Sequence, residues 1–305
     1  MRLIVYLLAA LAITCITIHV ILTQSWHTEP LVVAPHNTLT IVTAYYMLPM
    51  SKHSVEKYQQ WLPNLLSLKA CMMVYHDGSV NVSSRPFTRW SVQPLEDIMA
   101  ASPFAQSLSP PKHPFWKYQR AIDPERSYHR DYRLYWMWTL KTTFLTNTIR
   151  DNPFNTPYFF WMDAGSQRDT QHTGQWLWSP QVPPGKIVFA EAALRLPDTI
   201  SPYDNHISGA MFGGDATAVL RFHDAFVALW RNMSEQDLFV GKDQILYNML
   251  CYSQDRDLCH LVKAPRRWRV PWSEEIRWSE NPWFYVLTYL LESQDESVYL
   301  GHKGV

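Results

Sequence analysis

Residues 158–168 read YFFWMDAGSQR, in which five apolar residues lead directly into Asp163, Gly165 and Arg168. A continuous apolar run of this kind is typical of a parallel strand that is covered on both faces of its sheet. Open α/β sheets bind their ligands just beyond the carboxyl ends of such strands. We therefore predict that Asp163 lies at the ligand edge of a sheet, either as a ligand of a hard divalent cation or as the cap of the following turn.

Two strands and a helix are predicted before this segment. Thr38–Leu48 is rich in β-branched and aromatic residues, and a helical spacing of apolar residues follows from Ser54. A second strand, Ala70–Tyr75, closes on the turn residues His76-Asp77-Gly78. This order predicts a βαβ unit with a right-handed crossover. It places Asp77 at the carboxyl end of a strand, as a candidate ligand-binding residue.

The middle of the chain contributes one candidate cation. Residues 81–130 contain many prolines, serines and basic residues with little periodicity, which predicts long loops with short helices. Residues 131–150 have the apolar spacing of a helix, and Lys141 falls on its apolar stripe. A lysine in that position either extends its ammonium group to solvent or meets an anion.

Two more strands are predicted after the Asp163 segment. Lys186–Ala192 should end near Glu191, and Ile207–Phe212 should end at two glycines, with Asp215 capping the next helix. The chain has only ten glycines, and their clustering here predicts positive φ angles or close approach of the backbone to a ligand. The glycines in or beside these segments are Gly165, Gly209, Gly213, Gly214 and Gly241.

Asp243 opens a short apolar pattern that predicts a buried helix, and Gly241 and Lys242 precede it. One interpretation is that Asp243 caps this helix. The other is that the helix holds Asp243 as a carboxylate of the functional site. There it would accept hydrogen bonds from sugar hydroxyls or assist the chemistry.

The amino-terminal region predicts a membrane anchor. Residues 3–22 carry no formal charge and have about the 20-residue length that an α-helix needs to cross a bilayer. This exceeds the apolar core of about 7–15 residues in a cleaved signal peptide, so we expect an uncleaved anchor, with Arg2 on the cytoplasmic side. The predicted organisation is a cytoplasmic tail (1–2), the anchor (3–22), a stem (23–37) and a luminal domain (38–305).

Sequons and cysteines agree with a luminal domain. Asn81-Val82-Ser83 and Asn232-Met233-Ser234 are acceptor sequons for N-glycosylation. In an oxidising compartment Cys251 and Cys259 are the local choice for a disulfide, although two buried thiols explain them equally well. We expect a single-pass type II protein of the Golgi or endoplasmic reticulum membrane.

Charge and motifs exclude several classes of function. Basic and acidic residues balance at 27 each, so no net field indicates nucleic acid as a partner. The chain lacks the motifs of P-loop nucleoside triphosphatases, dinucleotide oxidoreductases, serine hydrolases and zinc proteases. A basic run over residues 263–269 is either a solvated loop or a phosphate contact.

The order YFFWMDAGSQR, then ISGAMFGG before a helix, then GKDQILYNML resembles the HtrL/YibB family over about Thr38 to Lys263. Members of that family are similar to nucleotide-sugar glycosyltransferases of the GT-A fold. The resemblance implies an α/β, Rossmann-related domain with a mostly parallel central sheet flanked by helices, preceded here by one transmembrane helix.

The resemblance also implies a donor site. The strand-end motif of the GT-A class is Asp-x-Asp, and Asp163-Ala164-Gly165 matches its position but lacks the second carboxylate. We expect Mn²⁺ or Mg²⁺ at Asp163, completed by His302, with Lys141, Arg168 or the basic run supplying charge if metal binding is weak. The resemblance further places the sugar beside the segment from His206 to Gly214, which includes Gly209 and Gly213, and beside Gln244.

The function implied is transfer of a sugar from a nucleotide sugar to a glycan, glycoprotein or glycolipid. Inversion at the sugar would need a general base, for which Asp243 and Glu191 are the candidates. One alternative is a catalytically silent GT-A-like domain that binds glycans or acts as a scaffold. Another is a hydrolase that uses Asp163 and Asp243. Binding of a nucleotide sugar separates the transferase from the silent domain.

Overall fold

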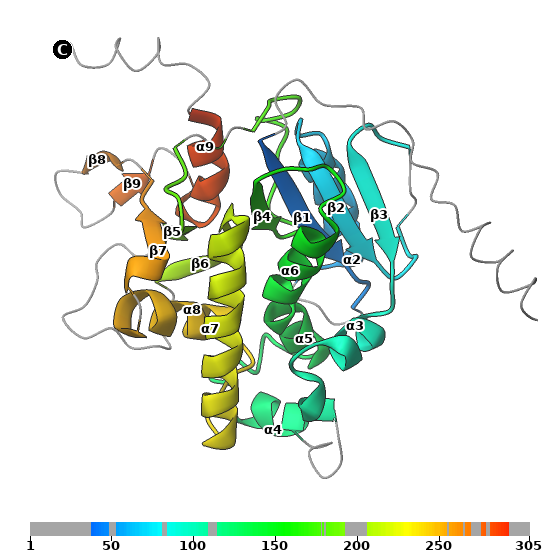
Figure 1. The fold of residues 1–305 in the computed structure, drawn as a ribbon, viewed down its shortest axis with the longest axis vertical. Helices are drawn as coiled ribbons and strands as arrows, with labels where there is room; N and C mark the ends of the chain where they lie inside the picture. Colours follow the sequence, from blue (N-terminus) through cyan, green and yellow to red (C-terminus); the bar gives the residue numbers. More distant parts are fainter. Residues whose placement is uncertain are drawn as a thin grey trace, which may run out of the picture. The chain divides into compact units, whose positions relative to one another are not determined.

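The central feature of the structure is a seven-stranded sheet with helices on both faces (Figure 1). The computed structural model describes residues 38–48, 53–80, 84–108, 115–177, 179, 181–192, 206–254, 256–264, 266–269, 276–278 and 281–292. The predictions for residues 1–37, Asn81 and His302 lie outside these ranges. Within them, no helix combines the length and apolar character that a membrane span requires.

The sheet is mixed but mostly parallel. Its strands in spatial order are β3 (Thr88–Val92), β2 (Cys71–His76), β1 (Leu39–Tyr45), β4 (Tyr158–Met162), β6 (Ile207–Asp215), β5 (Ile187–Glu191) and β7 (Cys259–Val262). Every neighbouring pair is parallel except the two that involve β6. Helix α2 (Val55–Leu66) connects β1 to β2, so the predicted βαβ order and the α/β class are confirmed.

The reversed direction of β6 decides which residues meet at the ligand edge. Met162 at the end of β4 pairs with Met211, and the amide of Asp163 donates to the carbonyl of Ala210 at 2.8 Å. The beginning of β6 therefore lies beside the end of β4. Gly213 and Gly214 pair with Phe160 and Phe159 inside the sheet, away from that edge. The prediction that the strand ends at these glycines is wrong, because β6 continues through them to Asp215.

The helices differ from the sequence predictions at one place that matters for the site. The single helix expected over residues 131–150 is interrupted at Leu140 (φ −82°, ψ −6°), so Lys141 becomes the first residue of a second helix. Asp215 caps the longest helix as predicted, because its side chain accepts from the Ala218 amide. The remaining elements are α3 (Leu95–Ala101), α4 (Phe115–Ile122), α5 (Arg133–Thr139), α6 (Lys141–Asp151), α7 (Ala216–Glu235), α8 (Asp243–Met249), α9 (Tyr285–Glu292), the pair β8 (Arg266–Arg269) and β9 (Ile276–Trp278), 3₁₀ turns at Ala105–Leu108, Arg256–Leu258 and Pro282–Phe284, and a π turn at Leu250–Gln254.

Strand β4 separates two apolar cores. Successive side chains of a strand point to opposite faces, and Phe159 and Trp161 accordingly join the core under α5, α6, α7 and α8. Phe160 and Met162 join the core under α2 and α9. Burial on both faces explains why the strand is apolar without alternation, as the sequence indicated.

A disulfide stabilises the segment after α8. Cys251 and Cys259 are bonded, with their Cα atoms 5.5 Å apart, and they tie the π turn to the start of β7. The predicted local pairing is therefore confirmed over the alternative of two buried thiols. Cys71 is buried in β2.

Gly213 provides a test of this packing. A Cβ atom at position 213 would lie 2.2 Å from the Phe159 carbonyl oxygen and 2.6 Å from the Phe160 Cα, neither of which can move without disturbing the sheet. We expect Gly213→Ala to lower the free energy of unfolding by at least about 1–3 kcal/mol, measured by urea denaturation. Thr217→Ala, at an exposed position in α7, should change it by no more than about 0.5 kcal/mol. Unchanged stability of Gly213→Ala would contradict the register of β4 and β6.

Candidate functional site

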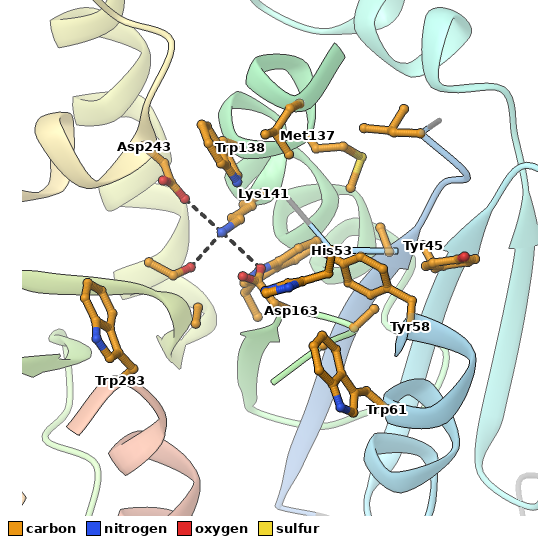
Figure 2. Close-up of a pocket in the computed structure, with 18 of the residues that line it drawn as sticks. Tyr45, His53, Tyr58, Trp61, Met137, Trp138, Lys141, Asp163, Asp243 and Trp283 are labelled. Atoms are coloured by element: carbon orange, nitrogen blue, oxygen red, sulfur yellow. Dashed lines mark hydrogen bonds and ion pairs between the residues drawn. The ribbon is translucent and has the colours of Figure 1, made fainter. Parts of the chain in front are cut away.

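A cavity of about 580 Å³ opens at the edge where β1 and β4 end and β6 begins (Figure 2). Asp163, Gly165 and Arg168 line it directly after β4, and Gly209 lines it near the beginning of β6. The apolar strand singled out in the sequence thus delivers its polar residues to a cavity at the expected edge.

Lys141 lies between two carboxylates from different elements (Figure 2). Its Nζ is 3.0 Å from Asp163 Oδ1 and 2.9 Å from Asp243 Oδ2, and it donates to the Gly209 carbonyl at 2.7 Å. An ammonium group has three protons, so these three acceptors use all of them. Of the two outcomes predicted for Lys141, the structure has the one in which it meets an anion.

Burial and charge act in opposite directions on Lys141, which is only 3% exposed. Burial lowers the pKa of its ammonium, but Asp163 and Asp243 outweigh that effect and raise the pKa above its ordinary value. Burial raises the pKa of the Asp243 carboxyl, and the Lys141 ammonium opposes that rise. Because one ammonium serves two carboxylates, we regard Lys141 as charged.

Asp243 is held by Lys141 and does not cap a helix. The cap position of α8 is Lys242, which makes no side-chain cap, and Asp243 is the first helical residue. Its Oδ1 accepts from the Gln244 amide at 2.9 Å, while Oδ2 lies against Lys141. Gln244 also lines the cavity, and its side chain donates to the Ile207 carbonyl at 2.7 Å. Both oxygens of Asp243 are therefore engaged within the protein.

Glycine permits close packing at two positions of this site. A Cβ at Gly209 would lie 2.8 Å from Asp243 Oδ2, and one at Gly165 would lie 3.0 Å from the rings of Tyr58 and Trp61. The sequence predicted close approach at these glycines, but to a ligand. The groups that approach most closely are side chains of the protein itself.

Asp163 is the more accessible carboxylate of the pair. Its side chain is 37% exposed, compared with 3% for Asp243. Its Oδ1 takes both the Lys141 contact and a 2.7 Å hydrogen bond from the Trp161 indole. Its second oxygen, Oδ2, accepts no hydrogen bond within the described ranges and remains available to a ligand.

Arg168 presents a guanidinium group at the cavity wall. Its Cζ lies 4.9 Å from the centroid of the Trp61 ring and 5.1 Å from that of Phe284, so the group is stacked between two aromatic side chains. Its Nε donates to the Gly165 carbonyl at 3.4 Å. Neither terminal nitrogen has a hydrogen-bond partner in the part of the chain that the structure describes. The stacked guanidinium is thus positioned to receive an anion.

Aromatic side chains form much of the remaining wall (Figure 2). The rings of His53, Tyr58 and Trp61 contact one another with centroids 5.0–6.1 Å apart. Trp138 and Trp283 also line the cavity, and all five side chains are partly exposed. Such flat surfaces fit sugar rings or nucleobases.

Besides Gly213 and Gly214, three more predicted site residues do not reach this cavity. Asp77 follows β2 and accepts from the Met47 amide at 3.2 Å, beside a separate small hollow. Glu191 ends β5 at the same sheet edge, but it is buried and paired with Lys263 at 2.9 Å. His206 is buried next to the ring of Tyr252. Strand β6 separates Glu191 from Asp163, and β1 lies between the strand that precedes Asp77 and β4.

One polar group in the cavity wall was not predicted from the sequence. His129 lines the cavity, and its Nδ1 lies 2.6 Å from Asp123 Oδ2, which also accepts from the Tyr135 hydroxyl at 2.7 Å. Burial raises the pKa of Asp123, but the hydrogen bonds from His129, Tyr135 and the Glu125 amide outweigh it and lower the pKa. Asp123 and His129 precede α5 in a segment without periodicity. The only sequence signal for them is an acidic residue and a histidine six positions apart.

The described residues do not form a site for Mn²⁺ or Mg²⁺. Among them no group of three or more histidine, cysteine, aspartate or glutamate side chains is placed to hold a metal ion. Hard cations take about six oxygen ligands, whereas Lys141 and the Gln244 amide already occupy the oxygens of Asp243. Asp163 Oδ2 alone remains, and His302 lies outside the described ranges.

Removal of Lys141 tests the charge arrangement. Lys141→Met leaves Asp243 buried without an opposite charge, which should lower the free energy of unfolding by about 3–5 kcal/mol near neutral pH. An unpaired buried carboxyl has a raised pKa, so the folded state binds its proton more tightly than the unfolded state does. The loss should therefore shrink as pH falls and grow as pH rises.

Urea denaturation at several pH values measures this effect. The double variant Lys141→Met/Asp243→Asn removes the buried charge and should regain part of the lost stability. A Lys141→Met protein as stable as the parent at pH 8 would contradict the arrangement.

The family assignment rests on the segment that contains these charges. A family model described as "Bacterial protein of unknown function (HtrL_YibB)" matches residues 117–270, just over half of the chain. No curated protein matches the chain. The matched segment runs from α4 past β8 and includes Lys141, Asp163 and Asp243. In agreement with the sequence resemblance, the chain belongs to the HtrL_YibB family.

Proposed function

We propose that this protein is a GT-A-like glycosyltransferase that moves a sugar from a nucleotide sugar to a hydroxyl group of a glycan, glycoprotein or glycolipid. The observation that carries the proposal is that two groups line one cavity at the ligand edge of the sheet: the carboxylate oxygen Asp163 Oδ2 and the guanidinium of Arg168, which lies over two aromatic rings. A nucleotide sugar combines the matching groups, because its hydroxyls donate hydrogen bonds and its diphosphate is an anion.

Each charged residue then has a distinct role. Arg168 binds the diphosphate and stabilises the charge that grows on it as the sugar departs. Asp163 accepts hydrogen bonds from sugar hydroxyls. Lys141 has no proton left for a phosphate, so it orients Asp163 and keeps Asp243 charged rather than contacting the donor. We derive no step that requires a divalent cation.

One observation also favours a protein that binds glycans without catalysis. The aromatic wall around Trp61, Trp138 and Trp283 fits sugar rings whether or not a reaction follows. A silent domain would bind free oligosaccharides but no nucleoside diphosphate. A hydrolase with two acting carboxylates is less compatible with the site, because Lys141 engages both Asp163 and Asp243.

We further propose that the domain lies in the lumen of the secretory pathway behind the predicted anchor. The disulfide between Cys251 and Cys259 supports an oxidising compartment. Asn232 of the second sequon is exposed at the end of α7, which supports its accessibility to glycosylation.

Nucleotide binding tests the proposed donor site. Calorimetric titration of the full-length protein with uridine, guanosine and thymidine diphosphates should find one that binds, both with and without a metal chelator. Arg168→Gln should weaken that binding about 10- to 100-fold, the equivalent of about 1.5–3 kcal/mol for a charged hydrogen bond. Arg89→Gln, at an exposed position on β3, should leave it unchanged.

Two results would contradict the proposal. If no nucleoside diphosphate binds while oligosaccharides do, the protein is a glycan-binding domain. If binding disappears with the chelator and returns with Mn²⁺, a metal ion rather than Arg168 carries the diphosphate.

The proposed luminal location is tested by a separate measurement. Peptide mapping of the non-reduced protein from cells should find Cys251 and Cys259 in one disulfide-linked species. Glycosidase treatment should increase the electrophoretic mobility of the parent, and Asn81→Gln/Asn232→Gln should remove that change. A protein with free thiols and no glycan would place the domain on the cytosolic side.

A further inference from the structure

We propose that His129 is the general base that removes the proton from the acceptor hydroxyl, and that Asp123 and Tyr135 hold it in position. This inference rests on the proposed transferase function and names a catalytic residue for it. It implies that the configuration at the anomeric carbon is inverted, because a base that deprotonates the acceptor assists direct displacement.

The two bases expected from the sequence are poorly placed for this step. Both oxygens of Asp243 are engaged by Lys141 and by the Gln244 amide. Glu191 is paired with Lys263 and does not line the cavity. Direct displacement at the sugar therefore needs another proton acceptor in the cavity wall.

His129 has the geometry of such an acceptor. Its side chain is 5% exposed and forms part of the cavity wall, and its Nδ1 lies 2.6 Å from Asp123 Oδ2. Asp123, whose pKa is lowered, is the acceptor in this contact, so the proton of the neutral ring resides on Nδ1. The lone pair of His129 is then on Nε2, which has no hydrogen-bond partner among the residues described.

The rest of the hydrogen-bond network fixes the ring. Asp123 Oδ1 accepts from the Glu125 amide at 2.8 Å, and Oδ2 accepts also from the Tyr135 hydroxyl at 2.7 Å. The imidazole and the Trp138 ring are nearly perpendicular, at 83°, with their centroids 4.8 Å apart. Carboxylate, phenol and indole thus restrict the orientation of His129 from three sides.

The charges near His129 come from every element packed against it. Asp123 and Glu125 belong to its own loop, and Lys242 before α8 pairs with Glu125. Arg120 of α4 donates to the His129 carbonyl at 3.2 Å, and Tyr135 contributes from α5. Asp123 is the one in direct contact with the imidazole, and a positive charge on the ring would be stabilised by that carboxylate.

The aromatic residues beside His129 mark the acceptor side of the cavity. Trp138 is partly exposed next to the imidazole, and Tyr128, adjacent in sequence, lines the cavity while 70% exposed. A sugar ring lying on these faces would bring a hydroxyl to the part of the wall that contains His129. Arg168 and Asp163, which we assign to the donor, enter from the segment after β4.

The step balances in protons and electrons. The acceptor oxygen forms a bond to the anomeric carbon, and the bond from that carbon to the donor phosphate oxygen breaks. The electron pair of the broken bond leaves with the nucleoside diphosphate, whose charge Arg168 stabilises. The acceptor proton moves to Nε2 of His129, and the resulting imidazolium pairs with the Asp123 carboxylate.

The test compares variants of the full-length protein with the nucleoside diphosphate sugar that it uses and a panel of methyl glycosides as acceptors. His129→Gln should lower kcat by about 10²- to 10⁴-fold and leave the Kd for the nucleoside diphosphate within about twofold. Imidazole added to His129→Ala should restore part of the rate. His172→Gln, a histidine outside the cavity, should behave as the parent does.

Two further readouts separate catalysis from a structural role. The pH dependence of kcat should differ between the parent and His129→Gln. Asp123→Asn should lower kcat more than it raises KM, because its amide can stabilise the opposite tautomer. NMR of the product should show an inverted anomeric centre.

Different results would overturn different claims. Variants that lose stability but keep the turnover of their folded fraction, or a product with retained configuration, would show that His129 is not the base while the transferase stands. A parent protein that neither binds a nucleoside diphosphate nor transfers sugar would overturn the proposed function, and the role of His129 with it.

Discussion

The site depends on the contacts of the Lys141 ammonium group with two carboxylates and one backbone carbonyl. The ammonium group joins α6 to the end of β4, to the beginning of β6 and to the start of α8, through Asp163, Gly209 and Asp243. A buried cation needs opposite charge nearby, and here two carboxylates supply more than one compensating charge. Of the two carboxylates, Asp163 is the more exposed and lines the cavity.

This arrangement follows from three local features of the backbone. The interruption at Leu140 makes Lys141 the first residue of α6, and the absence of a side chain at Gly209 lets Asp243 approach β6. The amide of Asp163 is fixed by the Ala210 carbonyl. Together these features bring three charged groups to one point.

The sequence predicted the parts of the structure that local patterns determine. The apolar run before Asp163, the capping of α7 by Asp215 and the βαβ order all depend on spacing within a single segment. The direction of β6 does not, because a strand has the same apolar pattern in either direction. The predicted end of this strand at Gly213 and Gly214 was also wrong, because β6 continues to Asp215. The partners of Lys141 and Asp123 were also unpredictable, because they form only after distant segments pack.

The cavity is lined by residues inside the segment that the family model matches and by residues outside it. The segment that the family model matches, residues 117–270, contains His129, Lys141, Asp163 and Arg168. Trp61 precedes it and Phe284 follows it, although these two rings hold the guanidinium of Arg168. Part of the aromatic surface of the cavity is thus encoded outside the segment that the family model matches. A change in the flanking segments alone would alter which molecules fit the cavity and leave the charged centre as it is.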